Sequence, residues 1–228
     1  MRIKQSNRHV LRCIASIVGL LILAASFTSC KLFDRLGFDT YDYMSERVIR
    51  TISPDSDTAA ELSLLLDVLI TDSPSLVLFD NTADAIRYYR DAVLEYMLRT
   101  DYAKYSGNRA LIEKANAKYP EYQISQIIPE SEFEATMYRC FGGSVKISHA
   151  DGGKFKYLPD IGAYISMIDS SDSGYYADIS GIDETEKTYR VRFRVKSSDD
   201  DIASDEYFAL IIKREDGTLY IKKLTATE

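Results

Sequence analysis

Tryptophan is absent from this 228-residue chain, and histidine, cysteine and proline occur only 2, 3 and 5 times. So few imidazole and thiol groups leave no cluster with the spacing of metal ligands, and no phosphate-binding glycine loop or catalytic motif stands out. The sequence therefore predicts no metal and no cofactor, and it favours a binding role over an enzymatic one.

Acidic residues are missing from residues 1–29, which contain the basic residues Arg2, Lys4, Arg8 and Arg12. The rest of the chain keeps 24 of the 28 basic residues and all 35 acidic ones, a net charge of −11. Such an acidic body repels phosphate backbones, which argues against nucleic acid as a partner.

An apolar run long enough to span a membrane is also lacking near the N-terminus. The basic stretch is followed by an apolar run over residues 13–27, about 15 residues, whereas a membrane-spanning helix needs about 20. A basic segment, a short apolar segment and small residues before a cysteine are typical of a signal peptide. Residues 1–29 are therefore predicted to be a signal peptide.

The residues that close this segment, Phe27-Thr28-Ser29-Cys30, resemble the lipobox of bacterial lipoproteins, with Phe27 where leucine is usual. The resemblance implies cleavage before Cys30 and a diacylglyceryl group on its thiol. It also implies attachment to the extracytoplasmic side of a bacterial cell membrane, inner or outer, by two acyl chains, which suffice for stable anchoring. An ordinary secreted protein or a signal anchor is the alternative.

The third cysteine, Cys140, has no intrachain disulfide partner if Cys30 carries lipid. It lies beside the apolar stripe formed by Phe133, Met137 and Phe141. We therefore expect Cys140 to be buried as a small apolar residue.

The body of the chain divides into a tether over residues 30–56, with a possible short helix from Tyr41 to Ile52, and one domain over residues 57–228. Within the domain, an apolar period of 3.6 residues predicts helices across residues 57–142. They run from Thr58 to Asp72, from Asn81 to about Tyr102, from Asn108 through Tyr119, and from Pro129 to Gly142.

Two of these helices begin with a capping box. Thr58 with Glu61, and Ser131 with Glu134, have the spacing at which each side chain bonds the other's backbone N–H. We therefore expect Thr58 and Ser131 to be N-cap residues.

From Ser144 the apolar period changes to 2, which predicts antiparallel strands across residues 144–224. Strands are expected at 145–148, 154–158, 163–168, 175–182, 188–196, 206–213 and 219–224. The turns Asp151-Gly152-Gly153 and Glu215-Asp216-Gly217 predict hairpins. Phe208–Ile212 is apolar on both faces and is expected inside the sheet.

Helices followed by antiparallel strands indicate an α+β fold, with N-terminal helices packed on a curved antiparallel sheet. In the C-terminal stretch 213–221, an Asp-Gly turn precedes an aromatic-bearing strand. This ending and the order of the elements resemble NTF2-like and cystatin-like domains. The resemblance implies helices laid in the concave face of the sheet, and it implies no activity.

The strand from Tyr189 to Lys196 alternates apolar and cationic side chains. Its row of Arg190, Arg192, Arg194 and Lys196 could grip a polyanion, but a solvated face with Asp178 or Glu206 as cross-strand partners is the preferred interpretation.

The remaining candidate sites also have two readings each. The acidic loops 169–172 and 199–201 lack the ligand spacing of a calcium loop and are interpreted as solvated turns. The pairs Tyr88-Tyr89 and Tyr175-Tyr176 could line a cleft, but one member of each is expected in the core. His149 is expected at the surface, because a general base needs an orienting partner and a pocket.

These features together favour a lipid-anchored, non-enzymatic module that binds an envelope protein or polymer. The alternative is a small-molecule or isomerase-like pocket in an NTF2-like cone. An interior pocket with an inward carboxylate and tyrosines favours the alternative, whereas a filled interior with an exposed apolar or cationic patch favours the binding module.

Overall fold

The computed structural model describes residues 41–71, 73–143, 146–167, 174–197 and 204–227. The predicted signal peptide, Cys30 and residues 31–40 of the tether lie outside the described residues. So do the two acidic loops. Residues 42–228 form one compact unit that carries all the described helices and strands.

The α+β class is confirmed. The helices are α2 (Asp57–Leu66), α3 (Thr82–Tyr88), α4 (Arg90–Thr100), α5 (Tyr102–Gly107), α6 (Arg109–Lys118) and α7 (Glu130–Phe141), with 3₁₀ turns η1 (Tyr43–Ser45), η2 (Asp67–Leu69) and η3 (Pro120–Tyr122). The strands are β1 (Arg50–Ile52), β2 (Ile127–Pro129), β3 (Phe155–Leu158), β4 (Ala163–Ser166), β5 (Tyr175–Glu184), β6 (Thr188–Ser197), β7 (Tyr207–Lys213) and β8 (Leu219–Ala226).

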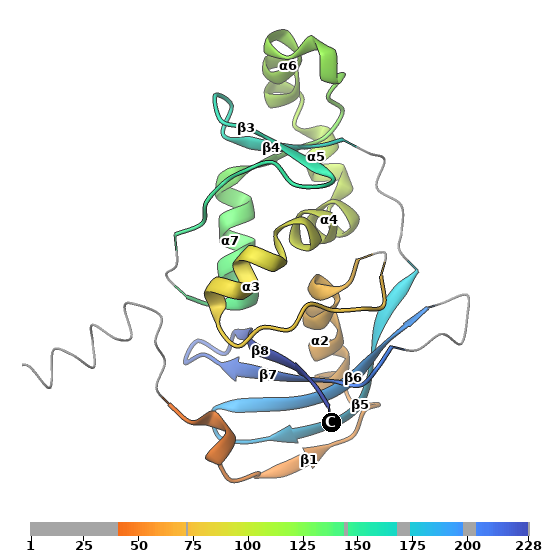
Figure 1. The fold of residues 1–228 in the computed structure, drawn as a ribbon, viewed down its shortest axis with the longest axis vertical. Coiled ribbons are helices and arrows are strands. Elements are labelled where there is room, and N and C mark those ends of the chain that lie inside the picture. Colours follow the sequence, from red (N-terminus) through yellow and green to blue (C-terminus); the bar gives the residue numbers. More distant parts are fainter. Residues whose placement is uncertain (1–40, 72, 144–145, 168–173, 198–203, 228) are drawn as a thin grey trace, which may run out of the picture. The chain divides into compact units, whose positions relative to one another are not determined.

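The larger sheet is antiparallel and has five strands in the order β1-β5-β6-β7-β8 (Figure 1). The apolar strand β7 lies between β6 and β8, which confirms that it is inside the sheet. The pairing shifts register at Ile179/Gly181 and at Leu210/Ile211. Such irregularities increase the local twist, which curves the sheet.

Strand β6 has the two faces that its alternation predicts. The side chains of Val191, Phe193 and Val195 are fully buried, whereas Arg192 and Arg194 are exposed. This apolar row lies in the main core with the buried side chains of α2 and α7.

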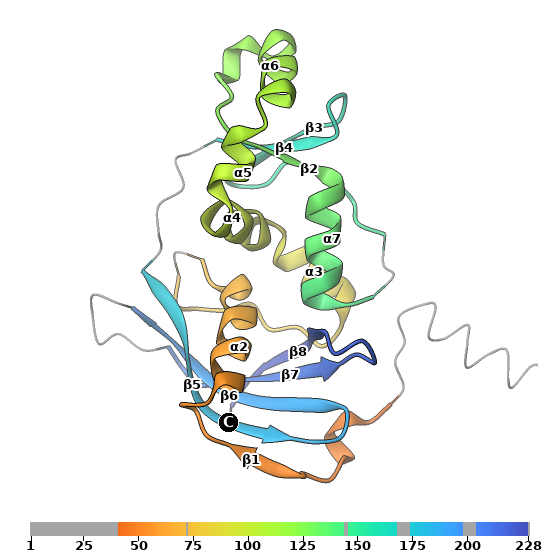
Figure 2. The same ribbon diagram turned by 180° about the vertical axis from the view of Figure 1, so that it is seen from behind.

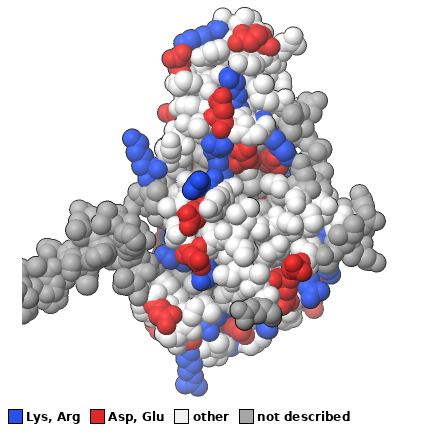
Figure 3. Space-filling view, viewed as in Figure 1, with Lys and Arg blue, Asp and Glu red and all other residues white. Residues whose placement is uncertain are grey.

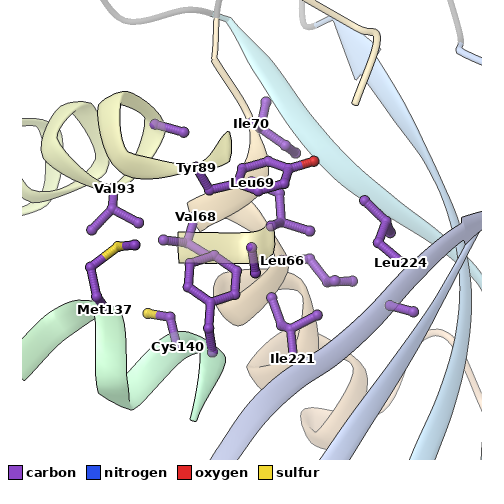
Figure 4. Close-up of a cluster of buried hydrophobic side chains, with 14 of the residues drawn as sticks. Leu66, Val68, Leu69, Ile70, Tyr89, Val93, Met137, Cys140, Ile221 and Leu224 are labelled. Carbon is purple, nitrogen blue, oxygen red and sulfur yellow. The ribbon is translucent and has the colours of Figure 1, made fainter. Parts of the chain in front are cut away.

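Helices α2 and α7 pack directly against the larger sheet, and α3 and α4 pack against them (Figure 2). Figure 4 shows side chains from α2, η2, α4, α7 and β8 directed toward one another, with Cys140 among them. Cys140 is free and 3% exposed, as expected. The side chains of Phe133, Met137 and Phe141 are fully buried on the same face of α7.

Two of the expected strands belong to a second, smaller sheet, of order β2-β4-β3. In this sheet Ile128 pairs with Tyr164, which pairs with Tyr157, and this row packs with the main core on the side of α4 and α7. Ile127 and Ile165 face the other way, into a cluster with residues of α6. A period of 2 predicts which side chains share a face, but it does not specify the partner strand.

The tether prediction is wrong for residues 42–52. No helix spans Tyr41–Ile52. Tyr43–Ser45 forms the turn η1, and β1 pairs with the C-terminal end of β5. Arg190 fixes this segment, because its Nη2 donates to the carbonyl oxygens of Tyr43, Met44 and Glu46 at 2.9, 2.9 and 2.8 Å. The residues that hold the segment are far away in sequence, so local pattern did not reveal it.

Both predicted capping boxes are wrong. Helix α2 begins two residues early, with Ser56 as N-cap accepting from the Ala59 N–H. That start also places Asp57 in the first turn, where a negative charge is favourable. Helix α7 begins at Glu130 with no side-chain cap, and Glu134 bonds His149 instead.

The other helix ends agree in part. Asn81 caps α3 as expected, and glycines 142 and 143 end α7 with φ of 69° and 91°. The helix expected from Asn81 to Tyr102 breaks at Tyr89 into α3 and α4, and α5 follows separately. Asn108 precedes α6 but makes no side-chain cap bond.

The two predicted hairpin turns have different outcomes. The turn at Gly217, with φ of 83°, joins β7 and β8 as predicted. The Asp151-Gly152-Gly153 turn joins no strand pair, because Lys146–Ser148 is not a strand. Asp151 instead accepts from the backbone N–H of Tyr157 at 2.9 Å.

Candidate functional site

The space between the larger sheet and the helices is filled by apolar side chains of the main core. Asp67 lies at this boundary, where its carboxylate accepts from the Ala177 N–H at 3.3 Å. Burial raises the pKa of Asp67, an effect that the hydrogen bond from Ala177 partly opposes. The carboxylate therefore serves to join η2 to β5, and it does not line either of the hollows described next.

Two hollows lie side by side on the outer surface of the helices. The first, of about 340 Å³, is bounded by α2, η2, α4, α7 and the β7–β8 turn. The second, of about 410 Å³, is bounded by α4, α5 and α7. Both are lined by Tyr96 of α4 and Arg139 of α7, so we treat them as one surface and call it the Arg139 groove. Figure 2 shows how the three helices that contribute most of its lining, α2, α4 and α7, are arranged.

Arg139 is the distinctive side chain of the groove. It is exposed, and no carboxylate of the described residues lies within salt-bridge distance of its guanidinium. Sequence inspection overlooked it, although a signal is present: no acidic residue stands three or four positions from Arg139 on α7, where a helical ion pair would form.

The first half of the groove has an apolar wall. Leu64 of α2 is 65% exposed, and Leu65, Val68 and Leu219 line the same hollow. Burial raises the pKa of the Cys140 thiol, and Arg139 opposes this in part. The thiol is therefore protonated and unreactive at neutral pH, in keeping with its role as a buried apolar residue.

The second half of the groove is polar. Lys104 of α5 pairs with Glu132 of α7 at 2.5 Å, and Asp101 and Thr100 complete this rim. Burial and the neighbouring Glu132 raise the pKa of Tyr105, so its hydroxyl stays protonated. Because Lys104 already has a carboxylate partner, Arg139 is the cation that remains available to an incoming anion.

His149 does not lie at the surface as predicted. Its Nδ1 is 3.0 Å from the Tyr164 hydroxyl, its Nε2 is 3.1 Å from Oε1 of Glu134, and its ring stacks on Tyr157 at 4.9 Å between centroids. Through these two contacts the ring joins Glu134 of α7 to Tyr164 of β4.

The same cluster joins α7 to the smaller sheet through a second carboxylate. The Tyr157 hydroxyl donates to Glu130, and this bond raises the pKa of Tyr157 to about 12. Burial raises the pKa of Tyr164 to about 12. Both phenols stay protonated at neutral pH, so the cluster is a hydrogen-bonded clamp between elements.

The cationic row of β6 is engaged within the protein at its two ends. Lys196 pairs with Asp178 at 2.6 Å, as the cross-strand interpretation expects, and Arg190 donates to the η1 carbonyls. Arg192 lies over Gly181, where a Cβ would come within 2.7 Å of its Nη2. Glu206 accepts instead from the Ser180 hydroxyl. The two ends of the row are therefore engaged within the protein, whereas Arg192 and Arg194 in its middle are exposed.

The tyrosine pairs divide between core and surface. Tyr89 is 3% exposed and Tyr88 is 46% exposed, which confirms the expectation for the first pair. In the second pair Tyr176 is exposed, while Tyr175 is half-buried and packs against the main core.

A weakly charged surface lies over the extended segment that leads into α3. Figure 3 shows few charged side chains on that part of the face. Val77 and Leu78 are 51% and 45% exposed there. The Tyr89 hydroxyl donates to the Val77 carbonyl at 2.6 Å, which holds the segment in place.

Within the described part of the chain, no group of three or more His, Cys, Asp or Glu side chains could hold a metal ion. Among the described helices, none has both the length and the apolar character needed to cross a membrane.

Comparison of the chain with models of known protein families, with curated proteins and with solved structures finds no match. These comparisons therefore add no support to the resemblance to NTF2-like and cystatin-like domains, which rests on the sequence.

Proposed function

We propose that this protein is a lipid-anchored, non-enzymatic binding module on the extracytoplasmic side of a bacterial membrane. Its Arg139 groove binds a protein partner of the cell envelope. The partner places a carboxylate against the Arg139 guanidinium and an apolar side chain against Leu64 and Leu65.

The observation that carries this proposal is the exposed, carboxylate-free guanidinium of Arg139 beside an exposed leucine. A guanidinium presents a planar fork of donors that matches a carboxylate, and arginine is enriched where protein partners meet. Lys104, the other cation that lines the groove, is already paired with Glu132. An acidic partner therefore meets one available cation next to apolar surface.

The filled interior also supports a surface-binding role over the alternative of a small-molecule pocket in the cone. Such a pocket needs an inward carboxylate that a ligand can reach. The half-buried carboxylate of Asp67 is instead bonded to the backbone of β5.

The lipid anchor is tested at Cys30. In the native bacterium, Cys30→Ala should abolish incorporation of labelled fatty acid and release the protein from the membrane fraction, or leave the uncleaved precursor. Fatty-acid labelling of the Cys30→Ala protein would overturn the assignment of this residue.

The groove is tested by photo-crosslinking in the same cells. A benzophenone amino acid replaces Leu64 in the groove or, as a control of similar exposure, Val77 on the segment before α3. We expect a discrete adduct from position 64 that falls at least tenfold when Arg139→Gln is added, and no such adduct from position 77. An adduct at position 64 that is unchanged by Arg139→Gln would refute the role of the guanidinium.

A further inference from the structure

Exposed apolar side chains gather on the turn through which the chain enters the domain. Met44, Val48 and Ile49 are 50%, 38% and 65% exposed, all within six consecutive residues. Isolated exposed apolar residues are ordinary, whereas three within six residues form a local group, which we call the apolar edge. Arg47 is also exposed between them and adds a cation to that edge.

The turn that displays these residues is held rigidly. Asp42 caps it by accepting from the Met44 N–H at 3.1 Å, and Arg190 donates to three of its carbonyl oxygens. The Glu46 carboxylate is bonded by the Thr185 hydroxyl, and the Ile49 N–H donates to the Glu184 carbonyl at 2.7 Å. The apolar side chains are therefore presented outward on a fixed backbone, and they cannot fold back into the core.

The position of this edge in the sequence, shortly after Cys30, indicates what it contacts. Cys30 precedes Asp42 by twelve positions, and twelve residues reach about 40 Å at most when fully extended. A lipid on Cys30 would therefore keep the turn within about 40 Å of the bilayer surface. Apolar side chains beside an exposed arginine suit the boundary between acyl chains and anionic headgroups.

We propose that the edge formed by Met44, Val48 and Ile49 inserts into the lipid headgroup region, so that the domain rests on the bilayer in one orientation. This inference rests on the proposed lipid anchor. The occupant is the bilayer itself, and the edge is distinct from the Arg139 groove, which stays free for the protein partner.

The absence of tryptophan from the chain allows a direct test, because one introduced tryptophan is the only fluorescent indole. Met44→Trp is compared with Val77→Trp, since these side chains are 50% and 51% exposed. Each full-length, lipidated protein is reconstituted in phosphatidylethanolamine–phosphatidylglycerol vesicles, with or without lipid that is brominated near the headgroup end of the acyl chain.

We expect bromination to reduce the emission of Met44→Trp at least twofold, together with a blue shift, and to leave Val77→Trp unchanged. A protein that sediments with the vesicles but shows equal quenching at both positions overturns the inference alone. A blue shift without quenching also overturns it, because protein and not lipid then covers the turn. Failure of both proteins to sediment with the vesicles overturns the inference together with the lipid anchor.

Discussion

The two sheets of this protein are stabilised in different ways. Apart from the short β1, the strands of the larger sheet have 7 to 10 residues, and their apolar side chains, such as Val191, Phe193 and Val195, enter a large core shared with α2 and α7. The smaller sheet has strands of three or four residues, and its outer face packs into a separate small cluster with α6. Polar clamps such as Tyr157 with Glu130 and His149 with Glu134 join it to α7.

A strand can therefore be held in its sheet mainly by its own buried apolar side chains, or with the help of hydrogen bonds from distant residues. Burial of apolar surface contributes about 25 cal/mol to stability for each Å². Long strands bury enough of it to be held against the core by their own side chains. Strands of three residues do not, so hydrogen bonds from distant side chains complete their attachment. We therefore expect substitutions in the larger core to act on the whole domain and those in the smaller cluster to act locally.

The largest effect is expected from Phe193→Ala in the larger core. Removing this fully buried ring should cost about 3–5 kcal/mol of the free energy of unfolding. Urea denaturation followed by circular dichroism measures the loss, and all amides should exchange faster. A cost below about 1 kcal/mol would mean that the space closes without penalty and that the core is not close-packed.

A smaller and more local effect is expected from Ile165→Ala in the small cluster. Ile165 is 1% exposed, and its truncation should cost about 2–4 kcal/mol. Hydrogen exchange should accelerate in α6 and β2–β4, while amides of β5–β8 keep their protection. Equal acceleration in both sheets would break the comparison, because the two regions would then unfold as one unit.

Tyr157→Phe tests the clamp and its pH dependence. Loss of the hydrogen bond to Glu130 should cost about 1 kcal/mol at pH 7. The folded pKa of Tyr157, about 12, lies above the value of about 10 for a free phenol, so its contribution is present below pH 10 and lost as the pH rises through 12. Between pH 10 and 12, the free energy of unfolding measured by urea titration should therefore fall less in Tyr157→Phe than in the unsubstituted protein.

The control for the stability of that variant at pH 7 is Tyr176→Phe, at an exposed position of β5. It should change the free energy of unfolding by less than about 0.5 kcal/mol. If Tyr157→Phe proves no more destabilising than this control, the hydrogen bond to Glu130 is not part of the attachment.

The smallest effect is expected from Arg194→Ala on the exposed side of β6. An exposed cation contributes about 0–1 kcal/mol. Arg190→Ala on the same row should cost more, about 1.5–3 kcal/mol, because three carbonyl oxygens of the η1 segment lose their donor. Equal costs measured by thermal unfolding would contradict the assignment of Arg190 to the turn.

The sequence by itself determined the class of the fold and the faces of its regular elements. The alternation in β6, the two-sided apolar run in β7, the cap at Asn81 and the glycines after α7 are local features whose meaning does not depend on distant residues. The stripe of α7 likewise predicted the burial of Cys140, because side chains three or four positions apart share one helical face.

Only the tertiary structure decided which elements meet. Period 2 could not show that β3 and β4 leave the main sheet, nor that β1 joins it through Arg190. The N-cap of α2 is Ser56 and not Thr58. His149 contacts Glu134 and Tyr164, which lie on elements that its position in the sequence does not identify. Nor could sequence alone place Arg139 beside Leu64, because a groove is formed by helices whose packing depends on the whole core.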